Sequence, residues 1–120
     1  MTQEQKELLL KDLCARLSYG VRIHSYCLFD QDSVDPLYSL RECNGKIKIN
    51  DLYYIEEVKP YLFPLSSMTE EQEREDYDIC KGYIIGYESK LIDFYNKNHI
   101  DYRGLIDMGL AIDATNKNIY

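Results

Sequence analysis

The sequence contains no tryptophan, only three phenylalanines and no long run of apolar residues. No segment approaches the roughly 18 apolar residues that a membrane-spanning helix needs, so we expect a chain that does not enter a membrane. Its polar beginning also lacks the apolar core of a signal peptide. The cysteines form no CxxC pair, which indicates reduced, mostly buried thiols and a cytoplasmic location. They are Cys14, Cys27, Cys43 and Cys80.

Motifs of catalysis and cofactor binding are also absent. No GxGxxG or Walker A segment occurs, which argues against a dehydrogenase or an NTPase. The only two histidines, His24 and His99, are 75 residues apart and belong to no HxH or HExxH motif. With the scattered cysteines, this spacing argues against a dedicated zinc site. We therefore expect no metal and no cofactor, and a binding protein rather than an enzyme.

Positive charge is scarce, because 14 Lys and Arg face 21 Asp and Glu, a formal net charge of −7. Proteins that bind nucleic acids need a basic surface to neutralise phosphates, so we expect no direct nucleic-acid binding. Acidic residues concentrate between positions 56 and 78, a run that is typical of a solvated helix face. The alternative is a surface that docks on a basic partner or imitates a phosphate backbone. The run comprises Glu56, Glu57, Glu70, Glu71, Glu73, Glu75, Asp76 and Asp78.

The composition predicts one globular domain over residues 1–120. With 45% hydrophobic and 29% charged residues, a chain of 120 residues can form its own core. Twelve tyrosines are unusual for this length. Their rings join an apolar body to a polar tip, so they either line a small, partly wet core or form a recognition patch; we favour the core.

The beginning of the chain predicts a helix over residues 2–17. Thr2 and Gln5 form a capping-box pattern at its start, and Gly20 is placed to end it in the left-handed conformation. Apolar residues recur along one face, which we expect to be buried. That face would comprise Leu8, Leu9, Leu10, Leu13, Cys14 and Leu17.

Three strands are expected next. Residues 21–29 alternate in polarity, and 37–43 and 46–49 flank the hairpin signal Asn44-Gly45. We predict that these strands form one three-stranded antiparallel meander, which is stable only with one face covered. The following segment 59–64 contains two prolines and is expected to lie extended over the sheet edge.

Two C-terminal helices complete the predicted fold. Thr69 and Gln72 form a second capping box, and this helix would turn Tyr77 and Cys80 inward before glycines break it at 82–86. The last helix is expected over residues 89–98. The predicted fold class is therefore α+β, with an N-terminal helix, a three-stranded antiparallel meander, and two C-terminal helices packed on the sheet.

The segment from residue 99 to residue 113 is the most specific-looking part of the chain. Apolar and charged residues alternate tightly there, and Gly104 and Gly109 mark turns. We expect Asp101, Arg103 and Asp107 to face outward or to bond locally. The candidate core anchors are Ile100, Leu105, Ile106, Met108, Leu110 and Ile112.

Five segments of the chain carry a resemblance to other proteins. They are Leu8-Leu-Leu-Lys-Asp-Leu-Cys-Ala-Arg-Leu17, Tyr19-Gly-Val21, Lys59-Pro-Tyr-Leu-Phe-Pro-Leu-Ser-Ser-Met-Thr69, Asn96-Lys-Asn-His-Ile-Asp-Tyr-Arg-Gly-Leu-Ile106 and Met108-Gly-Leu-Ala111. With these segments the chain resembles a group of small uncharacterised proteins from gut Bacteroidales and their phages. The resemblance covers most of the chain and weakens over residues 24–49 and 81–88. It implies an accessory gene of a bacterial or phage cytoplasm, and it brings no known activity, ligand or site residue.

One cluster of residues could carry chemistry. His99, Asp101 and Arg103 could act as general base, orienting carboxylate and anion clamp. Arg103 with Tyr102 and Lys97 could also hold a small anion or nucleotide, since the guanidinium offers a fork and the ring a stacking face. The structural reading, which we favour, is that His99 caps the preceding helix and that an Asp101–Arg103 pair fixes a bend.

Two functions follow from these patterns. The first is a non-enzymatic accessory or interaction protein that binds another protein, or a second copy of itself, through its acidic helix or its tyrosines. The second is a small-ligand binder, less an enzyme, at the corner formed by His99, Tyr102 and Arg103. The second function requires a concave site in which Arg103 is not already occupied by a carboxylate.

Overall fold

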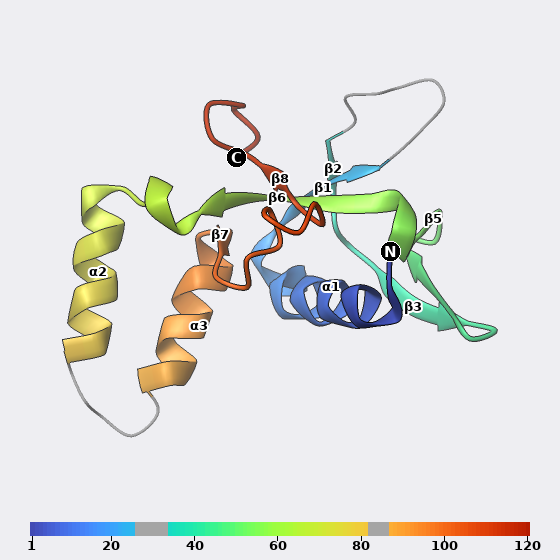
Figure 1. Ribbon diagram of the computed structural model, residues 1–120, viewed down its shortest axis with the longest axis horizontal. Helices are drawn as coiled ribbons and strands as arrows, with labels where there is room; N and C mark the ends of the chain where they lie inside the picture. The colour runs from blue at the N-terminus through green and yellow to red at the C-terminus, as the bar shows by residue number, and fades with distance from the viewer. Residues whose placement is uncertain (26–33, 82–86) are drawn as a thin grey trace.

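The computed structural model describes residues 1–25, 34–81 and 87–120 (Figure 1). It is an α+β structure with an N-terminal helix, one mixed and one antiparallel sheet, and two later helices. The helices are α1 (Gln3–Arg16), α2 (Glu70–Lys81) and α3 (Tyr87–Lys97), with short 3-10 turns at Leu17–Tyr19, Ile55–Glu57 and Leu65–Ser67. The strands are β1 (Arg22–Ser25), β2 (Asp35–Pro36), β3 (Leu40–Cys43), β4 (Lys46–Ile49), β5 (Tyr53–Tyr54), β6 (Val58–Pro64), β7 (Ile100–Asp101) and β8 (Ile112–Asp113).

Helix α1 begins where the sequence predicts. The Thr2 side chain accepts a hydrogen bond from the Gln5 backbone and the Gln5 side chain accepts one from the Thr2 backbone, which confirms the capping box. Leu9 and Leu13 are completely buried, so the predicted apolar stripe is correct at its centre. Cys14 and Leu17 were expected on the same stripe and are exposed instead, because the helix turns its Asp12–Arg16 side inward. Cys43 is exposed as well, so the prediction of mostly buried thiols is wrong for these two cysteines.

The predicted single meander is divided between two sheets. β1 pairs with β6, whereas β3 and β4 form a separate antiparallel sheet with β5. The Asn44-Gly45 turn between β3 and β4 is confirmed, with both residues at positive φ. Residues 26–29 of the first predicted strand lie outside the described residues.

Strand β6 is the centre of the mixed sheet and not a segment over its edge, as the prolines had suggested. It pairs with β1 antiparallel and with both β7 and β8 parallel. β7 and β8 take consecutive parts of its other edge, at Phe63–Pro64 and at Tyr61–Leu62. Because β6 has neighbours on both edges, Val58 and Leu62 are almost fully buried.

Helices α2 and α3 form an antiparallel pair that projects from the end of the mixed sheet (Figure 1). The second capping box, Thr69 with Gln72, is confirmed. The prediction that both helices pack on the sheet is wrong for α2, which packs mainly against α3 and has no buried residue. Tyr77, expected to point inward, is 65% exposed. The expected break at residues 82–86 lies outside the described residues.

The hydrophobic core lies between α1, the two sheets and the C-terminal segment. The anchors predicted in residues 99–113 divide: Ile100, Leu105 and Leu110 are buried, whereas Met108 is 45% exposed. Gly104 and Gly109 are at positive φ, as turns of this kind require. The buried apolar residues of the main cluster are Leu9, Leu13, Val21, Ile23, Leu37, Ile49, Ile55, Val58, Leu62, Leu105, Leu110 and Ala111.

Candidate functional site

The predicted corner lies where α3 ends and β7 begins. His99 follows the helix in the left-handed conformation, with φ of 58°, and its backbone N–H donates to the Asn96 carbonyl. This geometry closes the helix as the structural reading predicts. The chain then enters β7 alongside β6, where the Phe63 N–H donates to the His99 carbonyl.

Asp101 is buried and serves the backbone that follows it. One carboxylate oxygen accepts from the Leu105 N–H at 2.9 Å, and the other from the Ile106 N–H at 2.9 Å. Both bonds are charge-assisted, so they hold the turn after β7 firmly. Asp101 therefore bonds locally, as predicted, and it is not the partner of Arg103.

The carboxylate partner of Arg103 is Asp12, from the opposite end of the sequence. Arg103 Nε donates to Asp12 Oδ1 at 3.1 Å, and Arg16 Nε donates to Asp12 Oδ2 at 2.9 Å. Arg16 and Asp12 are completely buried, and Arg103 is largely so. Arg16 also donates to the Ile100 carbonyl at 2.6 Å. One carboxylate thus joins α1 to the segment around β7 through two guanidinium groups.

Tyr102 completes this ion cluster of Asp12, Arg16 and Arg103. Arg103 donates to the Tyr102 hydroxyl at 2.7 Å. The guanidinium carbons of Arg103 and Arg16 lie 4.7 Å and 5.4 Å from the centre of the Tyr102 ring. Tyr95 of α3 stacks on the same ring with centroids 5.5 Å apart. The Tyr102 ring therefore already contacts cations and an aromatic ring of the protein. A ligand that stacked on Tyr102 would have to compete with these contacts.

His99 stacks on Tyr120. The two rings are 3.8 Å apart at an interplanar angle of 10°. Burial, with a smaller effect of the Arg16 charge, lowers the pKa of His99 to about 4. Burial also raises the pKa of Tyr120 to about 12, and its hydroxyl accepts from the Arg22 N–H and donates to the Tyr61 carbonyl. At neutral pH this histidine is uncharged and is a poor general base.

A hollow of about 490 Å³ adjoins the corner, between the end of β6 and the turn after β7. The charged groups that line it are Asp101, Arg103 and Asp107. Two carboxylates thus face one guanidinium, which already binds Asp12. The requirement for an unoccupied Arg103 is not met in this geometry. Of the four predicted residues, the structure joins only Tyr102 and Arg103 to each other. His99 instead stacks on Tyr120, and Asp101 bonds to the backbone that follows it.

Sequence reasoning missed Asp12 and Arg16. A usable signal existed, because the two residues are spaced i, i+4 and flank Leu9 and Leu13 on the apolar side of α1. A buried charged pair still has hydrogen-bonding groups that need partners from elsewhere in the chain, but the sequence does not say which residues supply them.

We expect Arg103→Ala to lower the free energy of unfolding by about 1–3 kcal/mol, since Asp12 then loses one of two charge-assisted hydrogen bonds. Urea denaturation followed by circular dichroism measures this loss. The matched control is Arg41→Ala, because the Arg41–Asp51 pair is exposed and should contribute less than about 1 kcal/mol. Equal losses in the two variants would contradict a structural role for Arg103.

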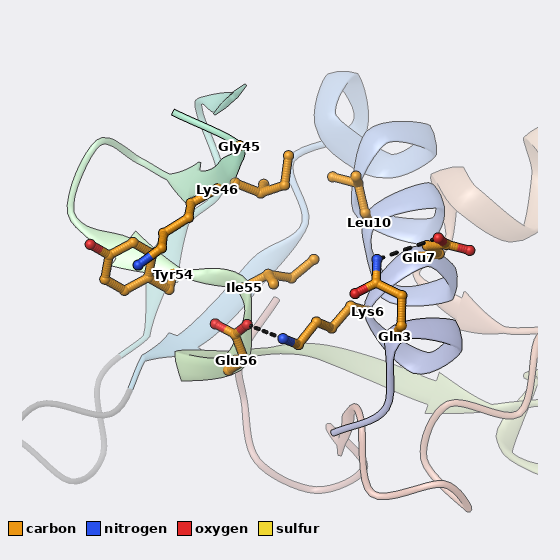
Figure 2. A pocket seen from close by; sticks show the side chains of 10 residues that line it. Gln3, Lys6, Glu7, Leu10, Gly45, Lys46, Tyr54, Ile55 and Glu56 are labelled. Atoms are coloured by element: carbon orange, nitrogen blue, oxygen red, sulfur yellow. Dashed lines mark hydrogen bonds and ion pairs between the residues drawn. The ribbon is translucent and has the colours of Figure 1, made fainter. Parts of the chain in front are cut away.

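A second hollow, of about 320 Å³, lies between α1 and the antiparallel sheet (Figure 2). Leu10 reaches it from the helix and Ile55 from the opposite wall. Lys6 crosses its lower side to pair with Glu56 at 2.7 Å. The hollow has an apolar floor and a charged rim, the usual composition of a small-ligand site. Its full lining is Gln3, Lys6, Glu7, Leu10, Gly45, Lys46, Ile47, Tyr54, Ile55 and Glu56.

Two residues of the acidic run, Glu56 and Glu57, lie in the 3-10 turn beside this hollow, and the other six lie in α2. Within α2 there are six acidic residues and two basic ones, and all but Asp76 of the acidic residues are exposed. We define the outer face of α2 as its exposed residues. They are Glu70, Glu71, Glu73, Arg74, Glu75, Tyr77, Asp78 and Lys81.

Within residues 1–25, 34–81 and 87–120, no three His, Cys, Asp or Glu side chains are grouped so that they could hold a metal ion. None of the helices in these ranges is long and apolar enough to cross a bilayer. Comparisons with protein-family models, with curated proteins and with solved structures gave no match.

Proposed function

We propose that this chain is a non-enzymatic interaction protein that binds a basic protein surface through the outer face of α2. The observation that carries the proposal is that α2 buries none of its 12 residues. A helix that fully buries no residue gains less from its own fold than a core helix does, since most helical stability comes from packing an apolar face. A partner that covers this helix would supply the burial of its surface that the rest of the chain does not provide.

The chemistry of the outer face defines the partner. Glu71, Glu75 and Asp78 are spaced i, i+4, i+7, so they form one acidic stripe along the helix. Tyr77 lies on another side of α2, with the Lys81 ammonium 6.0 Å from the centre of its ring, and is 65% exposed. Tyrosine is enriched at the centres of protein interfaces. A helix that carries an acidic stripe and also exposes an aromatic ring fits a basic surface that has an apolar pocket.

The inner face of α2 supports the same proposal. Its contacts with α3 include side-chain hydrogen bonds: Tyr95 donates to Asp76 at 3.2 Å, and Gln72 donates to Asn98 at 3.3 Å. The Cys80 thiol also donates to Asp76, at 3.5 Å. Such bonds orient two helices but each contributes only about 1 kcal/mol. The helix is thus positioned by α3 without being buried by it.

The alternative function, binding of a small anion or nucleotide at His99, Tyr102 and Arg103, has less support. Asp12 occupies the Arg103 guanidinium, and burial holds His99 neutral. The cytoplasm of a bacterium or its phage, which the sequence resemblance implies, remains our proposal for the location.

Binding through the outer face can be tested by charge reversal. We expect the double variant Glu75→Lys, Asp78→Lys to lose capture of the partner from an extract, because it replaces two attractive contacts with two repulsive ones. Immobilised wild-type and variant proteins are compared, and the retained proteins are quantified by mass spectrometry. Tyr77→Ser should weaken capture of the same protein.

The matched control is Glu42→Lys, Asp107→Lys. It reverses two exposed carboxylates outside α2 and changes the net charge by the same amount. A partner retained by the wild type and the control, and lost by the α2 variant, supports the proposal. Equal loss in both double variants would mean that net charge alone drives capture, and equal retention would exclude the outer face.

A further inference from the structure

The hollow between α1 and the antiparallel sheet carries a second inference, independent of α2. Its floor consists of three aliphatic side chains from different elements, Leu10, Ile47 and Ile55. Leu10 and Ile47 are only partly buried, although both pack against the core. The exposed parts of these side chains provide a fixed apolar surface, and the volume of about 320 Å³ is at the lower end for small-ligand sites.

The rim of this hollow carries two lysines, Lys6 and Lys46, beside two glutamates, Glu7 and Glu56. Lys48 does not line the hollow but lies with Lys46 on the same face of β4, and the ammonium groups of Lys46 and Lys48 are 5.3 Å and 4.1 Å from the centre of the Tyr54 ring. In the part of the chain that the structure describes, neither ammonium has a carboxylate within 4.0 Å. Two neighbouring cations without a counter-charge attract an anion.

One carboxylate of the chain already binds a lysine of this rim. Glu56 binds Lys6 at 2.7 Å across the lower side of the hollow. The hydrogen bond from Lys6, with a smaller contribution from the charge of Lys46, lowers the pKa of Glu56. Lys6 is thereby occupied, so Lys46 is the cation of the lining that is left for a ligand.

We propose that this hollow binds a small aliphatic monocarboxylate, with the hydrocarbon chain on Leu10, Ile47 and Ile55 and the carboxylate at Lys46. An aliphatic chain matches the floor because it needs no hydrogen-bond partner there. Glu7 and Glu56 on the rim disfavour a more highly charged anion such as a phosphate ester. One negative charge on a short apolar body therefore fits this site best.

Hexanoate is a suitable probe, and hexanamide is its neutral counterpart of the same shape. In a titration of methyl-labelled protein, we expect hexanoate to shift the methyl signals of Leu10, Ile47 and Ile55 saturably, with a millimolar dissociation constant. The methyl signals of Ile100, which is buried near α3, serve as the internal reference. Hexanamide should bind about fivefold more weakly, since it lacks the ion pair.

Two lysine variants locate the carboxylate. Lys46→Gln should weaken hexanoate binding about fivefold and leave hexanamide binding unchanged. Lys48→Gln is the matched control, because Lys48 lies on the same strand and the same ring but does not line the hollow. The proposal is overturned if hexanoate causes no saturable shift, if hexanamide binds equally well, or if the two variants weaken hexanoate binding equally.

Discussion

Replacing Asp12 by alanine is expected to lower the free energy of unfolding by about 3–5 kcal/mol. The substitution leaves Arg16, which is completely buried, and the largely buried Arg103 without their shared counter-charge. A domain of this size is stable by only about 5–15 kcal/mol, so the variant should be partly unfolded at moderate temperature. Thermal and urea denaturation followed by circular dichroism provide the measurement.

A triple variant separates the loss of the charge from the loss of packing. Asp12→Leu, Arg16→Met, Arg103→Met removes the whole ion cluster and fills its space with apolar groups, and such replacements are often neutral or stabilising. We expect it to recover much of the stability that Asp12→Ala loses. If Asp12→Ala costs less than about 1 kcal/mol, the ion cluster does not join α1 to the C-terminal half in the way described.

Asn50→Ala is expected to lower the free energy of unfolding by about 2–4 kcal/mol, the largest loss expected after that of Asp12→Ala. Asn50 is only 3% exposed, and its Oδ1 accepts from the Tyr38 and Ser39 N–H groups while its Nδ2 donates to the Pro36 carbonyl. Alanine would leave these backbone groups without partners. It would also place a side chain without local hydrogen bonds at a φ of 53°.

Glycine at two neighbouring positions distinguishes these causes. Asn50→Gly adopts positive φ freely, so it should lose nearly as much stability as Asn50→Ala if the side-chain hydrogen bonds dominate. Asp51→Gly is the control, since Asp51 is also at positive φ but is exposed. It should change stability by less than about 1 kcal/mol. Full stability in Asn50→Gly, measured by urea denaturation, would contradict the role assigned to the Asn50 hydrogen bonds.

Local signals in the sequence predicted local structure well. The capping boxes at Thr2 and Thr69 and the Asn44-Gly45 turn depend on residues within one turn of each other, and all three are confirmed. The strand pairing could not be read in the same way. β7 and β8 are two residues long, too short for any periodicity, and their parallel pairing with β6 is decided by contacts far apart in the sequence.

At the candidate corner, too, local contacts could be predicted from the sequence and contacts between distant residues could not. The turn-forming role of Asp101 could be predicted, because its partners at Leu105 and Ile106 are four and five residues away. The partner of Arg103 could not, because Asp12 lies 91 residues away and no pattern links the two positions. The prediction that Tyr77 points inward is wrong because it assumed that α2 packs on the sheet, and α2 does not.

We propose above that the outer face of α2 binds a basic partner. The most direct test is the dissociation constant of the retained partner, purified and titrated by calorimetry against the wild type and the Glu75→Lys, Asp78→Lys variant at low and high salt. We predict at least tenfold weaker binding by the variant at low salt, and a wild-type affinity that falls as salt rises. An affinity that is unchanged by both the substitutions and the salt would contradict the claim.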